Sequence, residues 1–216
     1  PADGHIMFVR RERATGRRPS KLEMGQEQVD SDPLTGDWFP EPLAEPLSFA
    51  TEQRYVPVDK GDERPVDVLR IAIFMSPLDV HVNRAPEEGV LEHLEHRAGK
   101  GKKRGPFAPA YKKESQYNER VRSVYRLGDG TLIELTQISG ALARTIVPWI
   151  GKGTEVRRGQ RIGMIRLGSR VDVRVPAHHY TCDLISAESK DPSFPKGTFV
   201  QAGSTVIFRS RGDEEE

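Results

Sequence analysis

The chain has 216 residues, 36% of them apolar and 30% charged, so it is long enough for one globular domain or for one domain with long insertions. Its 33 Lys and Arg balance 32 Asp and Glu, which argues against a general nucleic-acid-binding protein, because such a protein needs a basic excess. The single cysteine, Cys182, excludes an internal disulfide framework and a cysteine-based metal cluster, and is typical of a reducing compartment.

Nothing in the sequence resembles a membrane-spanning helix, which needs roughly 18 to 20 consecutive apolar residues. Any contact with a membrane is therefore expected at its surface. The chain starts at Pro1, within one of the motifs described below, so we expect a further segment upstream of it.

Residues 10–65 are rich in Arg, Glu, Asp, Pro and Gly, and their apolar residues are scattered rather than periodic. Such a composition buries too little apolar area to offset the entropy that is lost on ordering. We therefore interpret 10–65 as a loop-rich insertion within a single domain that spans 1–216.

From Val66 onward the sequence is typical of β-strands. The run VDVLRIAIFMS (66–76) is β-branched and apolar, and VRSVYRL and TLIELTQIS alternate on either side of a GDG turn. RIGMIRL (161–167) and TVIFRS (205–210) are predicted to form further short strands. The sequence predicts a mainly β fold with few short helices.

Two segments share a pattern of Lys-Gly-Thr, then a valine, then a second glycine before a strand. They begin at Lys152 and Lys196. Glycines at such turns allow positive φ, and the repeat resembles the halves of a biotinyl or lipoyl barrel-sandwich. The pattern predicts a barrel-sandwich-like β domain with pseudo-repeated glycine-turn halves. A non-catalytic carrier module is the alternative, but it needs a lysine between hydrophobic residues at a hairpin tip, and neither lysine has such neighbours.

The segment between Pro86 and Glu119 is a polar, basic loop that holds Lys100, Lys102, Lys103 and Arg104 close to Phe107. An anionic lipid surface attracts each nearby cation by about 1 kcal/mol, and aromatic rings favour the headgroup level. These residues alone fit a membrane-docking loop and an ordinary solvated loop equally well, and the family resemblance described below favours membrane docking.

Polar side chains follow the apolar strand in FMSPLDVHVNRAP (74–86). On a continuous strand Asp79, His81 and Asn83 would share one face, because alternate side chains point the same way. A lone histidine there is as often structural as functional, but a carboxylate before it and an amide after it favour a site.

Two further motifs look ordinary when taken singly. Gly168 and Ser169 interrupt two β-branched runs in IRLGSRVDVRVP, and PADG opens the chain with Asp3. Either motif alone predicts only a turn.

Together and in this order, the motifs resemble the phosphatidylserine decarboxylase family, in particular its short form with the self-cleaving sequence Gly-Ser-Arg. The resemblance covers PADG, IFMSPLDVHVNRAP, YNER, the run from QISG to Pro176 and, more weakly, VQAGSTVI. It implies that the precursor cuts itself between Gly168 and Ser169, and that Ser169 becomes a covalent pyruvoyl group at the start of a small chain, 169–216.

The resemblance also implies residue roles. Asp3, His81 and Ser169 would form a relay for self-cleavage, in which imidazole acts as the base. Larger bacterial members carry two histidines three residues apart here, whereas this chain has His81 and then Arg84, so either His81 serves both maturation and turnover or Arg84 alters the scheme. We expect the substrate to contact Asp79, Asn83, Arg84 and Phe107.

The implied activity is decarboxylation of phosphatidylserine to phosphatidylethanolamine in phospholipid biosynthesis, at the cytoplasmic face of a membrane. The ketone of the pyruvoyl group would react with the serine amine, and its amide carbonyl would accept electrons as carbon dioxide leaves. We expect the two chains to stay associated, leave a homodimer open, and expect neither a metal nor a nucleic-acid partner. Another serine-headgroup lipid, including an archaeal-type ether lipid, or a soluble amino acid remains an alternative substrate.

Overall fold

The structure, a computed structural model, describes residues 1–14, 66–97, 109–110, 115, 118–141, 145–166, 168–184 and 197–214. The predicted docking residues Lys100, Lys102, Lys103 and Arg104, together with Phe107, lie outside this part. The predicted insertion also lies outside it, except for residues 10–14.

The predicted mainly β fold is confirmed. The described part contains thirteen strands of 2 to 11 residues, joined by turns, and the 3₁₀ helix η3 (Arg211–Glu214). The strands are β1 (Gly4–Ala14), β2 (Val66–Met75), β3 (Val82–Arg84), β4 (Gly89–Arg97), β5 (Arg120–Arg126), β6 (Leu132–Ile138), β7 (Ile146–Pro148), β8 (Glu155–Val156), β9 (Arg161–Ile165), β10 (Ser169–Pro176), β11 (Tyr180–Thr181), β12 (Phe199–Val200) and β13 (Arg209–Ser210).

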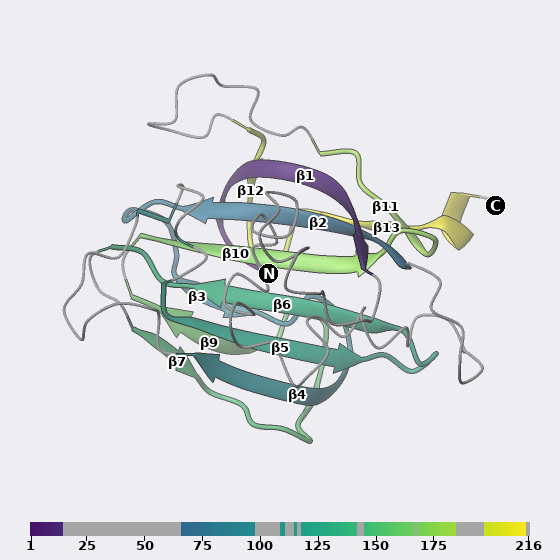
Figure 1. Ribbon diagram of the computed structural model, residues 1–216, viewed down its shortest axis with the longest axis horizontal. Coiled ribbons are helices and arrows are strands. Elements are labelled where there is room, and N and C mark those ends of the chain that lie inside the picture. Colours follow the sequence, from purple (N-terminus) through teal and green to yellow (C-terminus); the bar gives the residue numbers. More distant parts are fainter. Residues whose placement is uncertain are drawn as a thin grey trace, which may run out of the picture.

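The main sheet is antiparallel, with strand order β12-β1-β2-β10-β6-β5-β4-β8 (Figure 1). One continuous row of paired residues crosses seven of these strands, through Arg97, Arg120, Ile138, Arg170, Phe74, His5 and Phe199. Ser169 lies next to this row, at the end of the sheet where β2 and β6 finish and β10 begins. The candidate cleavage site is therefore at the N-terminal end of a central strand.

A smaller sheet, β3-β9-β7, pairs within itself and contributes to the same hydrophobic core as the main sheet. Core residues alternate along the central strands, because successive side chains point to opposite faces. Ile71 and Ile73 on β2 and Val171 and Val173 on β10 are completely buried, and Ile165 on β9 packs in the same cluster. The core thus fixes the strands on both sides of Ser169.

The two copies of the predicted repeat form the two outer edges of the main sheet. In each copy a two-residue strand follows the Lys-Gly-Thr: β8 pairs with β4 at one edge, and β12 pairs with β1 at the other. The Thr154 carbonyl accepts from the Leu91 amide and the Thr198 carbonyl from the Ile6 amide, both at 2.9 Å. The second glycines, Gly159 and Gly203, have φ of 77° and 85°, as the turn reading requires.

Three predictions of local structure differ from the structure. Residues 89–97, which the sequence assigned to a polar loop between Pro86 and Glu119, form strand β4. Leu91 and Leu94 of this strand pack on the core, and a bulge between Leu91 and His93 interrupts the alternation that would have indicated a strand. Residues 10–14 extend β1 and pair with 66–70 of β2, so backbone pairing continues into a segment whose composition indicated a loop. In the run 205–210 only Arg209 and Ser210 form a strand, whereas Ile207 and Phe208 pack on the core through their side chains. Apolar side chains can be buried in this way without a backbone ladder, so the apolar run alone overstated the strand.

Candidate active site

The Gly168–Ser169 bond lies in a turn that leads directly into β10. Gly168 has a φ of 61°, in the left-handed region that favours glycine, and Ser169 pairs with Met75 of β2 as the first residue of β10. The Ser169 side chain is completely buried, and its Oγ lies 3.4 Å from the Met75 Sδ. A thioether is a weak acceptor, so the hydroxyl is enclosed without a strong partner among the described residues.

His81 is bonded to the backbone at this turn. Its Nε2 accepts a hydrogen bond from the Gly168 amide at 2.9 Å, and its Nδ1 donates to the Asp79 carbonyl at 2.7 Å. These two bonds assign the proton to Nδ1 and leave the Nε2 lone pair facing the backbone of the predicted cleavage site. The structure therefore brings together His81, Gly168 and Ser169, with an imidazole nitrogen that can accept a proton.

A buried polar group lies beside Met75. The Asn83 amide donates to the Met75 Sδ at 3.6 Å, and the Gln137 amide donates to the Asn83 Oδ1 at 2.8 Å. Gln137 sits opposite Val171 on β6, and Ser139 lies beyond the end of that strand, in register with Ser169. The Ser139 hydroxyl is buried and has no hydrogen-bond partner in the described part.

The sequence reasoning gave no role to Met75, Gln137 or Ser139. All three belong to segments that carried the family resemblance. A polar Gln137 on the same face of β6 as the core residues Ile133 and Leu135 was the signal that could have indicated a site. Only the strand register, which sequence reasoning did not predict, places these residues beside Ser169.

Asp3 and Arg84 meet at a different point, the turn that follows β12. The Asp3 carboxylate accepts a hydrogen bond from the Ala202 amide at 2.5 Å, and Gly203 lies beside the Arg84 guanidinium. Arg84 also donates to the Gly159 carbonyl at 2.8 Å. Asp3 precedes β1, so β2 separates it from β10, and two strand spacings correspond to about 10 Å between backbones. The described contacts of Asp3 and His81 do not join the two side chains.

The expectation of a shared strand face for Asp79, His81 and Asn83 was wrong, because β3 begins only at Val82. Asp79 belongs to a tight turn in which its Oδ2 accepts from the Ser76 amide at 2.6 Å. His81 reaches the cleavage turn, whereas Asn83 is buried against Met75. Their roles toward a substrate stay predictions.

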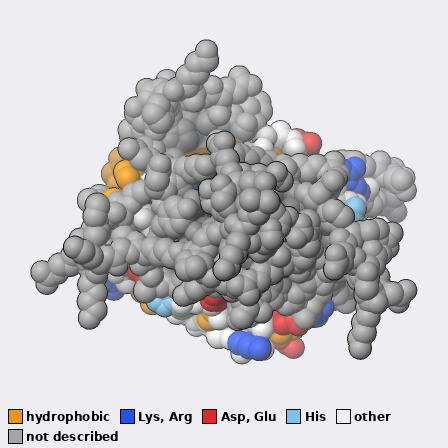
Figure 2. All heavy atoms as spheres, viewed as in Figure 1, with side chains coloured by type: hydrophobic (Ala, Val, Ile, Leu, Met, Phe, Trp, Pro, Cys, Tyr) orange, Lys and Arg blue, Asp and Glu red, His pale blue; other side chains and the backbone are white. Residues whose placement is uncertain are grey.

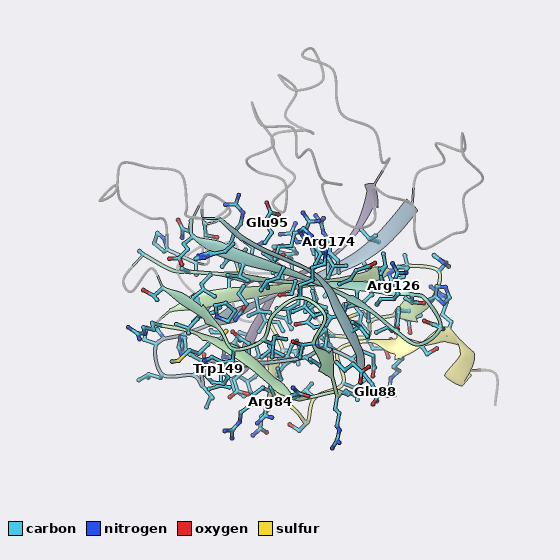
Figure 3. The ribbon with its side chains drawn as sticks, turned by 90° about the horizontal axis from the view of Figure 1, so that it is seen from below. Arg84, Glu88, Glu95, Arg126, Trp149 and Arg174 are labelled. Atoms are coloured by element: carbon cyan, nitrogen blue, oxygen red, sulfur yellow. The ribbon has the colours of Figure 1, made fainter. Side chains whose placement is uncertain are left out.

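Charged residues stabilise the opposite face of the sheet next to Ser169. Arg170 donates to both oxygens of Asp172, at 2.5 and 2.6 Å, and Arg70 on β2 also bonds to this carboxylate. Burial would raise the pKa of Asp172, but Arg170 and Arg70 hold it below its usual value. Both guanidinium groups also lie over the Phe8 ring, at 4.9 and 5.1 Å. Figure 3 shows Arg174, which belongs to the same face of β10, on the side away from Arg84.

Two cavities of about 1200 and 740 Å³ lie elsewhere: the larger is lined by the β8 end of the sheet, and the smaller by Arg84, Tyr180 and residues 203–210. Neither is lined by Ser169 or His81, and the Ser169 side chain is completely buried in the uncut chain. Among the described residues, no group of three or more His, Cys, Asp or Glu has an arrangement that could hold a metal ion. No helix in the described part is long and apolar enough to cross a membrane.

Comparison with known proteins agrees with the resemblance. The family model described as phosphatidylserine decarboxylase matches residues 1–208. A phosphatidylserine decarboxylase proenzyme of Streptomyces griseus is 53% identical over 142 residues, which cover 65% of this chain and 57% of that protein. The proenzyme of Thermobifida fusca is 48% identical over 179 residues, 80% of this chain and 72% of that protein.

An archaeal protein is also similar. A putative archaetidylserine decarboxylase proenzyme of Methanococcoides burtonii is 38% identical over 153 residues, 70% of this chain and 65% of that protein. No solved structure is significantly similar to the chain. The chain spans about half the length of the Streptomyces relatives that it matches, 46% to 57%. The family match over almost its whole length nevertheless shows that the chain belongs to the phosphatidylserine decarboxylase family.

Proposed function

We propose that this chain is the precursor of a pyruvoyl-dependent phosphatidylserine decarboxylase, and that it cuts itself between Gly168 and Ser169. The observation that carries the proposal is the His81 Nε2 bonded to the amide of Gly168, the residue that precedes a buried serine whose hydroxyl has a sulfur as its one partner among the described residues. A nucleophilic hydroxyl needs an adjacent base, and this arrangement supplies one.

In the proposed maturation, a turn of the Ser169 χ1 to another staggered rotamer brings its Oγ to the Gly168 carbonyl carbon. His81 releases the Gly168 amide, takes the hydroxyl proton on its Nε2 and gives it to the amide nitrogen of residue 169, so that the C–N bond breaks and an ester replaces the peptide bond. Loss of the α-proton of residue 169 then breaks the Cβ–Oγ bond and releases the Gly168 carboxylate. Water displaces the nitrogen of the resulting dehydroalanine as ammonia and leaves a pyruvoyl group.

The surroundings of Ser169 fit such a group. Backbone pairing with Met75 holds residue 169 at the start of β10, and Asn83 and Gln137 provide polar atoms beside it. When present, the pyruvoyl group supplies an electron sink for decarboxylation. His81 is the candidate proton donor at the carbon that loses carbon dioxide, because its Nε2 faces the same turn.

The two chains would stay associated after cleavage. The small chain would keep β10, which pairs with β2 on one side and β6 on the other, and β12, which pairs with β1. Its Val171 and Val173 lie in the hydrophobic core. Cleavage would free only the ends at Gly168 and residue 169, and would open the enclosed site for a substrate.

The proposed substrate is a lipid with a serine headgroup, met at the cytoplasmic face of a membrane. The predicted basic docking loop follows β4, which ends at Arg97, and precedes β5, which begins at Arg120. These two residues pair with each other and belong to the row of paired residues that crosses the sheet next to Ser169. The similarity to a protein named a putative archaetidylserine decarboxylase favours an archaeal-type lipid as the second candidate. Assays with both lipids distinguish the two.

The test is an intact-mass measurement of purified protein after incubation at neutral pH. We expect two chains, 1–168 and 169–216, the second blocked at its N-terminus by the pyruvoyl cap. Ser169→Ala should stay a single folded chain without activity, because alanine cannot yield the ketone, and Ser169→Cys should cut slowly. Release of carbon dioxide from phosphatidylserine by Ser169→Ala would show that the pyruvoyl proposal is wrong.

A further inference from the structure

The turn between β2 and β3 exposes apolar side chains to solvent. Leu78 is 97% exposed and Val80 57%, and they are two of the six large apolar side chains that are exposed in the described part. Pro77, next to Leu78, is also exposed. Figure 2 shows an apolar patch at the upper left, where the turn that follows β2 lies in Figure 1.

This turn has a fixed shape, so Leu78 cannot easily fold back onto the protein. The Asp79 amide donates to the Ser76 carbonyl at 3.0 Å, and the Ser76 amide donates to the Asp79 carboxylate at 2.6 Å. The Asp79 carbonyl is in turn held by the His81 ring. A leucine held outward in this way leaves its apolar surface in water, which is unfavourable unless another surface covers it.

The turn adjoins the cleavage site. A Cβ placed on Gly168 would lie 3.7 Å from the Pro77 ring, and His81 at the end of the turn binds the Gly168 amide. The exposed Arg166 follows Ile165, whose amide donates to the His81 carbonyl. An apolar tip, a cation and the reactive bond therefore lie side by side.

We propose that the turn Pro77–Val80 is a membrane-docking element. Leu78 and Val80 insert into the interfacial layer of a lipid surface, and Arg166 contacts anionic headgroups, so that docking presents a serine headgroup to residue 169. The inference rests on the proposed function for the identity of the headgroup, but the docking itself does not depend on it.

The size of the patch favours a lipid over a protein partner. A stable protein interface buries roughly 800 Å² on each side, far more than two side chains and a proline offer. Insertion into a membrane needs only a few apolar side chains with a nearby cation. A lipid surface is also the only occupant that brings the proposed substrate with it.

The experiment measures binding of the cleaved protein to vesicles of phosphatidylcholine and phosphatidylserine. Leu78→Ser should bind about tenfold more weakly at both low and high salt, because burial of a leucine is not screened by ions. Arg166→Gln should bind more weakly only at low salt. Val206→Ser is the matched control. Val206 is also an exposed apolar side chain (55%), but it lines the smaller cavity, away from the turn Pro77–Val80, so this variant should bind like the wild type.

Activity separates docking from chemistry. Leu78→Ser should cut itself normally and decarboxylate a short-chain phosphatidylserine, dissolved as monomers, at the wild-type rate, but should be slower on vesicles. Two results would overturn the docking proposal. One is unchanged vesicle binding by Leu78→Ser. The other is a lower mass in solution for Leu78→Ser than for the wild type, which would show that a second copy of the chain covers the turn. A cleaved wild type that binds vesicles but decarboxylates neither lipid form would instead refute the proposed function.

Discussion

Replacing His81 by glutamine tests whether this side chain is a base or only a structural partner of the cleavage turn. Glutamine reaches about as far as imidazole, so its side-chain oxygen can still accept from the Gly168 amide, which now binds the His81 Nε2 at 2.9 Å. It cannot act as a general base at neutral pH. The substitution thus keeps the bond to Gly168 and removes the proton acceptor.

The size of the effect decides between the two roles. Loss of one neutral hydrogen bond, such as the 2.7 Å bond from Nδ1 to the Asp79 carbonyl, costs about 1 kcal/mol, or about fivefold in rate if the transition state bears all of it. Loss of general-base catalysis typically costs about 10²- to 10⁴-fold. We expect His81→Gln to slow self-cleavage by at least about 100-fold.

The assay follows the disappearance of the uncut chain on denaturing gels, with masses checked for 1–168 and 169–216. His96→Gln is the matched control, because His96 is an exposed histidine whose ring bonds to Glu119, away from the turn. Cleavage within about fivefold of the wild type would refute the base role and leave His81 as a turn-stabilising residue.

Two further predictions concern Asp172 and Asp3. Asp172→Asn should lower the free energy of unfolding by about 3–5 kcal/mol in chemical denaturation, because it leaves the buried Arg70 and Arg170 without their carboxylate. The pKa of Asp172 is lower in the fold than in the unfolded chain. Its contribution to the free energy of unfolding is therefore complete above about pH 4 and is lost as the pH falls through the folded pKa. The same dependence of stability on acid pH in the wild type and in Asp172→Asn would contradict this prediction. Asp3→Asn keeps an acceptor for the Ala202 amide, so the melting temperature should not change. If Asp3 belongs to the relay, this variant should nevertheless cut itself more slowly. Unchanged cleavage would show that Asp3 only stabilises the turn that follows β12.

Local patterns predicted the central strands well. The apolar run from Val66 corresponds to β2, and the two alternating runs around GDG form the β5–β6 hairpin. These elements depend on side-chain periodicity and turn chemistry, both of which are visible within a few residues. The paired glycine turns were also predictable, because glycine allows the positive φ that such a turn needs, and Gly159 and Gly203 adopt it.

The geometry of the site could not be derived in the same way. Alternation assigned Asp79 and Asn83 to one face, but the hydrogen bonds between Ser76 and Asp79 form a turn there, and β3 starts afterwards. The placement of His81 at Gly168 joins residues 87 positions apart, and depends on how β2, β9 and β10 come together. Asp3 and Ala202 are 199 positions apart, and no local pattern links them.

The fold contains a second turn like the one at Ser169, and the difference between the two shows what cleavage requires. Gly130 and Thr131 lie at the start of β6 as Gly168 and Ser169 lie at the start of β10, and both glycines have positive φ. Three residues after Thr131 and Ser169, Glu134 and Asp172 pair with arginines of the neighbouring strands. At the first turn the Asp129 carboxylate accepts from both the amide and the hydroxyl of Thr131, at 2.8 and 2.9 Å. That hydroxyl is held away from attack by a strong acceptor. Among the described residues the Ser169 hydroxyl bonds to the Met75 sulfur alone, and a histidine accepts from the glycine amide of its turn. We infer that a glycine turn at the start of a central strand is not sufficient for cleavage, and that a thioether and an imidazole in place of a carboxylate cap make the turn at Ser169 able to cut itself.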